Sequence, residues 1–176
     1  MDWINVNEKY LDYLRCFEKR IPYSDYGKNK YKPFFGVLFK TNGLLYITQI
    51  SHAQDRHIKM KQSLDFYKIF DPKQEHRLIS VINLNYMFPI PEDETYPFEK
   101  SKVDTYRNFE SNEEKSKYID LLNKEMEAIN KLNLSAAAEK IYKFKYQFPD
   151  DRVSKRCLDY KLLEKYAMAW EKKTGK

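Results

Sequence analysis

The most regular alternation of apolar and polar positions lies between residues 34 and 57. Two apolar runs, 34–40 and 44–50, flank the dipeptide Asn42-Gly43. An Asn-Gly pair between apolar runs is a strong local signal for a β-hairpin, because both turn residues must adopt positive φ. The pattern therefore predicts a two-stranded hairpin. Its second strand leads directly into a polar segment, residues 49–57.

Shorter patterns in the front half predict a helix and more strands. Residues 3–6 read as a first strand, and Asn7 is suited to cap a helix over 8–17. Two further segments, 66–70 and 78–84, are rich in apolar and aromatic residues and are bounded by turn residues, so both are predicted strands. These segments would extend the hairpin into a sheet.

Two other segments are less regular. Residues 87–91 contain two prolines, and each proline removes a donor from a β-ladder, so this segment can form only an edge strand. The polar segment is expected to continue as a short helix through Ile58, Met60 and Leu64. Residues 21–32 form a polar loop rich in Tyr and Lys.

The periodicity becomes helical in the back half, after an acidic connector at residues 91–95. Ser111 and Glu114 have the spacing of a capping box and predict the start of a helix that runs to about residue 132. Two more helices are predicted over 135–148 and 154–170. In the helix that begins after Ser111, the residues expected to face inward are Tyr118, Leu121, Leu122, Met126 and Ile129. In the helix over 154–170 they are Leu158, Leu162, Leu163, Tyr166 and Trp170.

Strands come first along the chain and most helices follow, which predicts an α+β fold: a compact antiparallel sheet with surrounding helices, mostly C-terminal. A length of 176 residues fits one domain, 1–176, with a β-rich part over 1–91 and a helical part over 111–173.

Composition excludes several classes of protein. With 42% hydrophobic and 33% charged residues and no long apolar stretch, the chain reads as a globular, cytoplasmic protein without a membrane span. Its two cysteines, Cys16 and Cys157, are expected to be reduced thiols. CxxC and HExxH spacings are absent, so we expect no metal and no cofactor.

Charge and aromatic content point to a class of ligand. Residues 1–91 contain 14 Lys or Arg against 9 Asp or Glu, whereas residues 92–176 contain 18 against 17. Tyrosines alternate with lysines between residues 26 and 32. Cations neutralise phosphates and exposed rings stack on unpaired bases, so this pattern suits single-stranded RNA. A solvated loop above half-buried tyrosines fits the same pattern equally well.

The polar segment contains the side chains that metal-free RNA cleavage requires. Such cleavage needs a base for the ribose 2′-hydroxyl, a cation for the charge on phosphorus and an acid for the departing 5′-oxygen. His52 or His57 could transfer protons, Lys32 could stabilise charge, and Ser51 could orient the phosphate. The products would be a 2′,3′-cyclic phosphate and a 5′-hydroxyl. Packed histidines, a surface lysine and a strand-end serine are the alternative interpretation.

The order of these motifs resembles the ToxN/AbiQ family. The shared features are a basic loop, Lys32 before a Phe-Phe-Gly-Val-Leu strand, the Asn-Gly turn, Tyr46, a serine-centred segment followed by His57, and the run at residues 79–90. The resemblance implies a twisted antiparallel core and an endoribonuclease toxin of a type III toxin–antitoxin and phage abortive-infection system. It also implies inhibition by a repeat-derived folded RNA that the toxin trims from a precursor, and oligomers assembled through that RNA.

Agreement with the family is uneven at the site. Lys32 and Ser51 match the family's lysine and hydroxyl positions. The family more usually has Ser/Thr-Ser-Pro-Lys here, whereas His52 replaces the second hydroxyl and Gln54 replaces the lysine. A non-catalytic RNA-binding relative is therefore the alternative function. The residues expected to contact target or antitoxin RNA are Tyr26, Lys28, Lys30, Tyr31, Tyr46, Gln54, Arg56, Lys59 and Lys61.

Overall fold

The fold was obtained as a computed structural model that describes residues 1–27 and 30–174, so the predicted RNA contact Lys28 lies outside the described residues. The strands are β1 (Asp2–Val6), β2 (Phe34–Gly36), β3 (Lys40–Thr41), β4 (Leu44–His52), β5 (Phe66–Asp71), β6 (Gln74–Asn83), β7 (Phe88–Ile90) and β8 (Thr95–Pro97). The helices are α1 (Glu8–Arg15), α2 (Asp55–Lys59), α3 (Val103–Tyr106), α4 (Asn112–Asn130), α5 (Leu134–Gln147), α6 (Arg152–Arg156) and α7 (Tyr160–Thr174). The predicted α+β class is confirmed.

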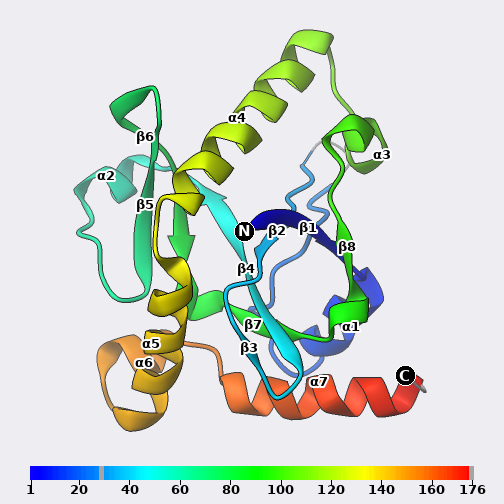
Figure 1. Ribbon diagram of the computed structural model, residues 1–176, viewed down its shortest axis with the longest axis vertical. Coiled ribbons are helices and arrows are strands. Elements are labelled where there is room, and N and C mark those ends of the chain that lie inside the picture. Colours follow the sequence, from blue (N-terminus) through cyan, green and yellow to red (C-terminus); the bar gives the residue numbers. More distant parts are fainter. Residues whose placement is uncertain (28–29, 175–176) are drawn as a thin grey trace.

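The strands form one antiparallel, twisted sheet in the order β5-β6-β4-β2-β1-β8 (Figure 1). The long strand β4 lies at its centre. The first half of β4 pairs with the short strands β3 and β7, and its second half pairs with β2 and β6. The polar segment at the end of β4 is therefore held between two neighbouring strands.

The predicted hairpin turn is confirmed, but its first strand is not continuous. Asn42 and Gly43 have φ values of 52° and 78°, as the turn requires. The predicted strand 34–40 is instead divided into β2 and β3, because β2 inserts between β1 and β4 while β3 pairs only with the start of β4. A Cβ at Gly36 would lie 2.9 Å from Ile47 Cγ2, so the close approach of β2 to β4 needs glycine.

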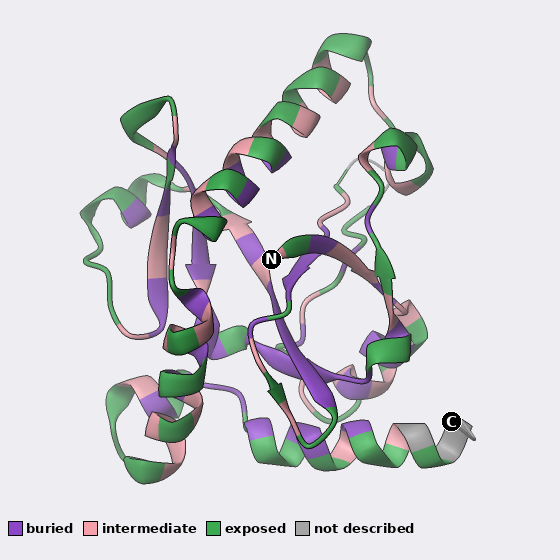
Figure 2. Ribbon diagram, in the orientation of Figure 1, coloured by how far each residue is buried: buried purple, intermediate pink, exposed green. Residues whose placement is uncertain are grey.

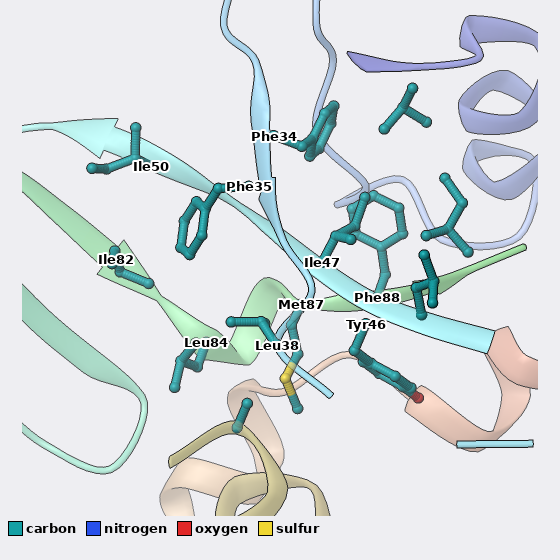
Figure 3. Packing of buried hydrophobic residues seen from close by; sticks show 14 of the residues in the cluster. Phe34, Phe35, Leu38, Tyr46, Ile47, Ile50, Ile82, Leu84, Met87 and Phe88 are labelled. Atoms are coloured by element: carbon teal, nitrogen blue, oxygen red, sulfur yellow. The ribbon is translucent and has the colours of Figure 1, made fainter. Parts of the chain in front are cut away.

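Aromatic and aliphatic side chains from the sheet form the centre of the core (Figure 3). Phe34, Phe35 and Phe88 are fully buried, as is Tyr46. The Tyr46 hydroxyl donates to Glu164 Oε1 at 2.8 Å, and burial beside this carboxylate raises the pKa of Tyr46 far above its usual range. Tyr46 is thus a core residue, which corrects the expectation that its ring contacts RNA.

The helices cover the sheet unevenly. Helix α4 packs on β5, and α7 packs against β7 and α1 along the lower edge of Figure 1. The outer turns of α4 and α7 are exposed in Figure 2, whereas the strands beneath them are mostly buried. The capping of α4 is as predicted, since Glu114 N donates to Ser111 Oγ at 3.1 Å. None of the helices among the described residues has the length and apolar run needed to cross a bilayer.

The last predicted helix, 154–170, is two helices. The chain is extended at Cys157, and Leu162 N donates to Asp159 Oδ1 at 3.2 Å, so Asp159 starts α7 as a capping residue. Leu158 enters the core between the two helices, and its N–H donates to Asn85 O. Leu162, expected to face inward, is 42% exposed because the break rotates the register of α7.

Other differences lie in connections. The acidic connector leads into a strand that was not predicted, β8, which pairs with β1. The predicted edge strand at 87–91 is confirmed as β7, which pairs with β4 alone among the described strands. The short helix after the polar segment ends at Lys59 rather than reaching Leu64, so Ile58 and Met60 are exposed. Cys16 and Cys157 are free thiols.

Candidate functional site

One glutamine side chain fixes the basic loop onto the centre of the sheet. Gln49 Nε2 donates to the carbonyl oxygens of Tyr23 and Lys32, both at 2.9 Å. The Tyr26 hydroxyl donates in turn to Gln49 Oε1 at 3.2 Å. Because Gln49 belongs to β4, these bonds position the loop side chains relative to the strand that carries Ser51.

The pairing of β2 with β4 brings Lys32 and Ser51 together. Phe34 pairs with Gln49, and continuing the same antiparallel register places Lys32 opposite Ser51. The two side chains line one cavity of about 310 Å³. The remaining lining residues are Lys19, Arg20, Ile21, Pro22, Tyr23, Tyr26, Thr48, Gln49, Asn83 and Tyr86. We call this the Ser51 cavity.

The Ser51 cavity is basic and aromatic. Lys19, Arg20 and Lys32 contribute cations, and none of the described residues that line the cavity is Asp or Glu. Arg20 is already paired with Glu18 at 2.8 Å, which leaves the two lysines as the less compensated charges. The rings of Tyr23 and Tyr26 are 47% and 44% exposed. Such a surface can bind a phosphate and stack on unpaired bases.

Lys32 also lines a second cavity. This cavity has a volume of about 230 Å³ and includes His52, the residue after Ser51. Successive side chains of a strand point to opposite faces, so His52 and Ser51 serve different cavities. The other lining residues are Lys30, Tyr31, Pro33, Ile50, Arg107, Tyr118, Leu121, Leu122 and Glu125. We call this the Glu125 cavity.

Glu125 is a buried carboxyl that sequence reasoning missed. It is 3% exposed, and the Ser80 hydroxyl donates to its Oε1. Burial raises the pKa of Glu125 to about 7, although the Ser80 hydrogen bond and the charge of Lys32 act in the opposite direction. The sequence did contain a signal for this buried acid. Glu125 lies among Leu122, Met126 and Ile129 on the apolar stripe of α4, where an acid is unusual.

His57 has a structural role, which corrects the expectation that it transfers protons. It is 6% exposed, and its Nδ1 accepts the backbone N–H of Gln54 at 3.1 Å, closing the start of α2. Arg56 Nε lies 3.3 Å from His57 Nε2. Burial, with a smaller contribution from Arg56, lowers the pKa of His57 below its usual range. The ring is therefore buried, and it lines neither cavity.

The remaining predicted contacts fall into two groups. Lys30 and Tyr31 line the Glu125 cavity, and Tyr26 lines the Ser51 cavity. The other group lies in or beside α2, at the left of Figure 1. A hydrogen bond from Lys68 Nζ of β5 to Ile58 O holds this helix to the sheet. The members of this group are exposed and line neither cavity: Gln54, Arg56, Lys59 and Lys61.

Metal ligands are not grouped in the part of the chain that the structure describes. No three His, Cys, Asp or Glu side chains there are close enough to hold a metal ion. The residues that line the Ser51 cavity offer cationic and hydroxyl groups, among them Lys32 and Ser51.

Solved structures with the same fold come from type III toxin–antitoxin systems. AbiQ, a lactococcal anti-phage endoribonuclease of such a system, superposes with a TM-score of 0.77 at 20% identity, covering 97% of this chain and 98% of AbiQ. A structure concerned with selective toxin inhibition by a non-coding RNA pseudoknot matches with a TM-score of 0.71 at 22% identity, covering 96% of each chain.

Sequence comparison gives the family. The endoribonuclease ToxN of Bacillus thuringiensis subsp. kurstaki is 30% identical over 89 residues, which is 51% of this chain and 43% of that protein. ToxN of Pectobacterium atrosepticum is 28% identical over 96 residues, 53% of this chain and 56% of that protein. These alignments thus span about half of each relative. The family described as toxin ToxN, type III toxin–antitoxin system, matches residues 2–168, and the chain belongs to this family.

Proposed function

We propose that the protein is an endoribonuclease toxin that cleaves cellular and phage RNA at the Ser51 cavity. The observation that carries the proposal is that Lys32 and Ser51 line one cavity without carboxylates, beside exposed tyrosine rings. A phosphate fits such a surface because it meets cations and hydroxyl groups and no negative charge. Membership of the ToxN family and the endoribonuclease activity of the named relatives support the same function.

The reaction is a transesterification within the RNA. The ribose 2′-oxygen attacks phosphorus, the bond from phosphorus to the 5′-oxygen breaks, and the products are a 2′,3′-cyclic phosphate and a 5′-hydroxyl. A base removes the 2′-hydroxyl proton and an acid returns a proton to the 5′-oxygen. Lys32 stabilises the added negative charge on the phosphate oxygens, and Ser51 orients one of those oxygens through its hydroxyl.

His52 is the histidine of the polar segment that remains available for proton transfer. It is exposed at the end of β4, whereas the ring of His57 is buried and bonded to Gln54. Lys32 lines both the cavity that contains His52 and the cavity that contains Ser51. We assign His52 to one of the two proton transfers, a role that requires the RNA to span both cavities across Lys32, because His52 does not line the Ser51 cavity.

Metal independence can be tested directly. With purified protein and a mixed RNA pool, cleavage should proceed in EDTA and should leave 2′,3′-cyclic phosphate and 5′-hydroxyl ends, because the lining residues provide charge without metal ligands. End-specific ligation and sequencing measure the chemistry. A preparation of Ser51→Ala made in parallel controls for contaminating nuclease.

Two outcomes would contradict the proposal. Strict dependence on added magnesium with 5′-phosphate products would exclude the transesterification mechanism. Tight RNA binding without any cleavage would identify the chain as the alternative, a non-catalytic RNA-binding protein, and would fit the replacements His52 and Gln54 at the polar segment.

The inhibitor in this proposal is a folded RNA derived from a repeat-containing precursor in the cytoplasm. The basic front half, with Tyr26 and Lys30 on one surface and Arg56, Lys59 and Lys61 on another, supports binding to more than one RNA unit. Alternating protein and RNA would then form closed or extended oligomers. The similar structure concerned with selective toxin inhibition by a non-coding RNA pseudoknot agrees with this class of partner.

Salt dependence tests this mode of binding. Affinity for the repeat-derived folded RNA should fall at least tenfold between 50 and 200 mM salt, because phosphate contacts release counterions. Filter binding gives the slope, and mass in solution gives the assembly state at low and high salt. A salt-independent affinity, or a particle that is always one-to-one, would contradict the assembly model.

A further inference from the structure

The Glu125 cavity combines a buried carboxyl with a wall of aromatic and cationic side chains. Its volume of about 230 Å³ lies below the 300–1,000 Å³ typical of drug-sized ligand sites, so it suits one small flat group. Tyr31 and Tyr118 contribute rings to the lining, and Lys30, Lys32 and Arg107 contribute cations. The cavity adjoins the Ser51 cavity through Lys32, which lines both.

The walls of this cavity are fixed before any ligand binds. The Tyr118 hydroxyl donates to Tyr31 O at 3.3 Å, and the Tyr31 ring stacks on Tyr106 with centroids 5.3 Å apart. The Arg107 guanidinium lies 4.8 Å above the Tyr118 ring and is paired with Glu114 at 2.7 Å, while its Nε is buried without a partner. Rigid rings lower the entropic cost of holding a ligand.

Glu125 lies on the same face of the sheet as His52. His52 pairs with Ser80 in the β4–β6 ladder, and Ser80 donates its hydroxyl hydrogen bond to Glu125. Burying an acid on the apolar stripe of a helix is unfavourable by comparison with an apolar residue. A retained group of this kind, in a cavity beside a reaction centre, is a candidate for ligand recognition.

The chemistry of the lining selects the part of an RNA that can enter. An ionised carboxyl repels a phosphate beside it, although Lys30, Lys32 and Arg107 in the same lining would attract one, so the charges do not single out a phosphate. A nucleobase is favoured, because rings stack on tyrosine and on guanidinium planes, and a carboxyl oxygen accepts hydrogen bonds from base amino groups. Uracil lacks an exocyclic amino group and presents carbonyl oxygens instead, so it offers the ionised carboxylate a poorer partner. The preference is therefore measured at pH 8, where Glu125 is mostly ionised.

We propose that the Glu125 cavity binds the base of a nucleotide next to the scissile phosphate, and that Glu125 accepts a hydrogen bond from the exocyclic amino group of that base. The inference rests on the proposed cleavage at the Ser51 cavity. It assigns Glu125 as a specificity residue that favours adenine, cytosine or guanine over uracil at one flanking position, while Lys32 and Ser51 address the phosphate.

A test with the wild-type protein uses base analogues. After the cleavage position is mapped, short RNAs carrying adenosine or purine riboside, which lacks the amino group, are compared at each flanking position. Removing the amino group should lower kcat/KM about tenfold or more at one position, because a buried acceptor is then left unpaired. Equal rates at every flanking position would overturn the proposal.

Variants identify the residue responsible. Glu125→Gln should reduce the preference for an amino-bearing base over uracil, because a carboxamide can also donate to a carbonyl oxygen. The control Glu127→Gln, on the exposed face of the same helix and paired with Lys131 at 2.7 Å, should keep the wild-type preference. Thermal unfolding of both variants shows whether each is folded, and an unchanged preference in folded Glu125→Gln would refute the assignment.

Binding separates this proposal from the proposed function. The same RNA pairs are titrated against Ser51→Ala, which cannot cleave in the proposed mechanism. If the wild type cleaves no RNA, the function fails, and the amino-group preference in binding still decides the role of the cavity. If cleavage occurs but neither binding nor kcat/KM distinguishes the analogues, the function stands and the role of Glu125 is refuted.

Discussion

Lys32→Ala should abolish growth inhibition and lower cleavage of a mapped RNA site by about 100-fold or more, which is the usual effect of removing one stabilising donor from a transition state. The fold should survive, because the bonds that hold the loop use the backbone of Lys32: its N–H donates to Ser24 O at 2.8 Å and its carbonyl accepts from Gln49. Single-turnover rates and circular dichroism measure the two effects.

Ser51→Ala should cause a comparable loss, because the register places this hydroxyl opposite Lys32. The matched control is Lys40→Ala, which removes an exposed lysine paired with Glu92 at 3.3 Å near the other end of β4. Its toxicity should equal that of the wild type. If the Lys32 and Ser51 variants both remain toxic at wild-type expression, the proposed site is wrong.

The parts of the fold that follow local rules could be predicted from the sequence. Asn42-Gly43 identified its turn because few residues tolerate positive φ at two successive positions. Asn7 and Ser111 identified helix starts, since each side chain accepts a backbone N–H near the beginning of its helix. Antiparallel pairing predicted that Lys32 and Ser51 lie near each other, but their register depends on a shift of two residues between β3 and β2.

Features that depend on tertiary contacts could not be predicted in this way. The break between β2 and β3 reflects a change of strand partners, which periodicity does not encode. Asp159 interrupts the helical pattern by capping α7, and Leu158 beside it is fully buried in the core. In the sequence, Gln49 could not be distinguished from the other polar residues around it. In the structure, the three hydrogen bonds of its side chain hold the loop that contains Tyr23, Tyr26 and Lys32.

Histidines near one another in sequence were a poor guide to the site. His52 and His57 belong to the same polar segment, but the strand ends between them and α2 begins. The ring of His57 turns into the protein to cap its own helix, while His52 remains exposed. Glu125, distant in sequence, lines a cavity with His52 because α4 crosses the sheet beside β5.

The free energy of unfolding should carry a distinct pH signature of Glu125. Its pKa is about 7 in the folded protein against 4.5 for an ordinary glutamate, so the folded state favours the protonated form. As pH rises above 4.5, the unfolded chain releases this proton more readily, and the folded state loses stability until pH passes 7. The loss totals about 3 kcal/mol. The pKa of about 7 already includes the opposing effect of the Lys32 charge.

Glu125→Gln removes this titration, so its stability relative to the wild type should rise by about 3 kcal/mol between pH 4.5 and pH 8. The wild type and the variant share the other charged or titratable residues of this cavity, so the contributions of these residues largely cancel in the difference between the two unfolding free energies. These residues are Lys30, Tyr31, Lys32, His52, Arg107 and Tyr118. Urea unfolding at several pH values measures it, with Glu127→Gln as the exposed control whose difference from the wild type should stay nearly constant. Parallel stability curves for wild type and Glu125→Gln would show that Glu125 ionises as freely in the folded protein as in water, and the cavity would then lack the buried acid on which its selectivity depends.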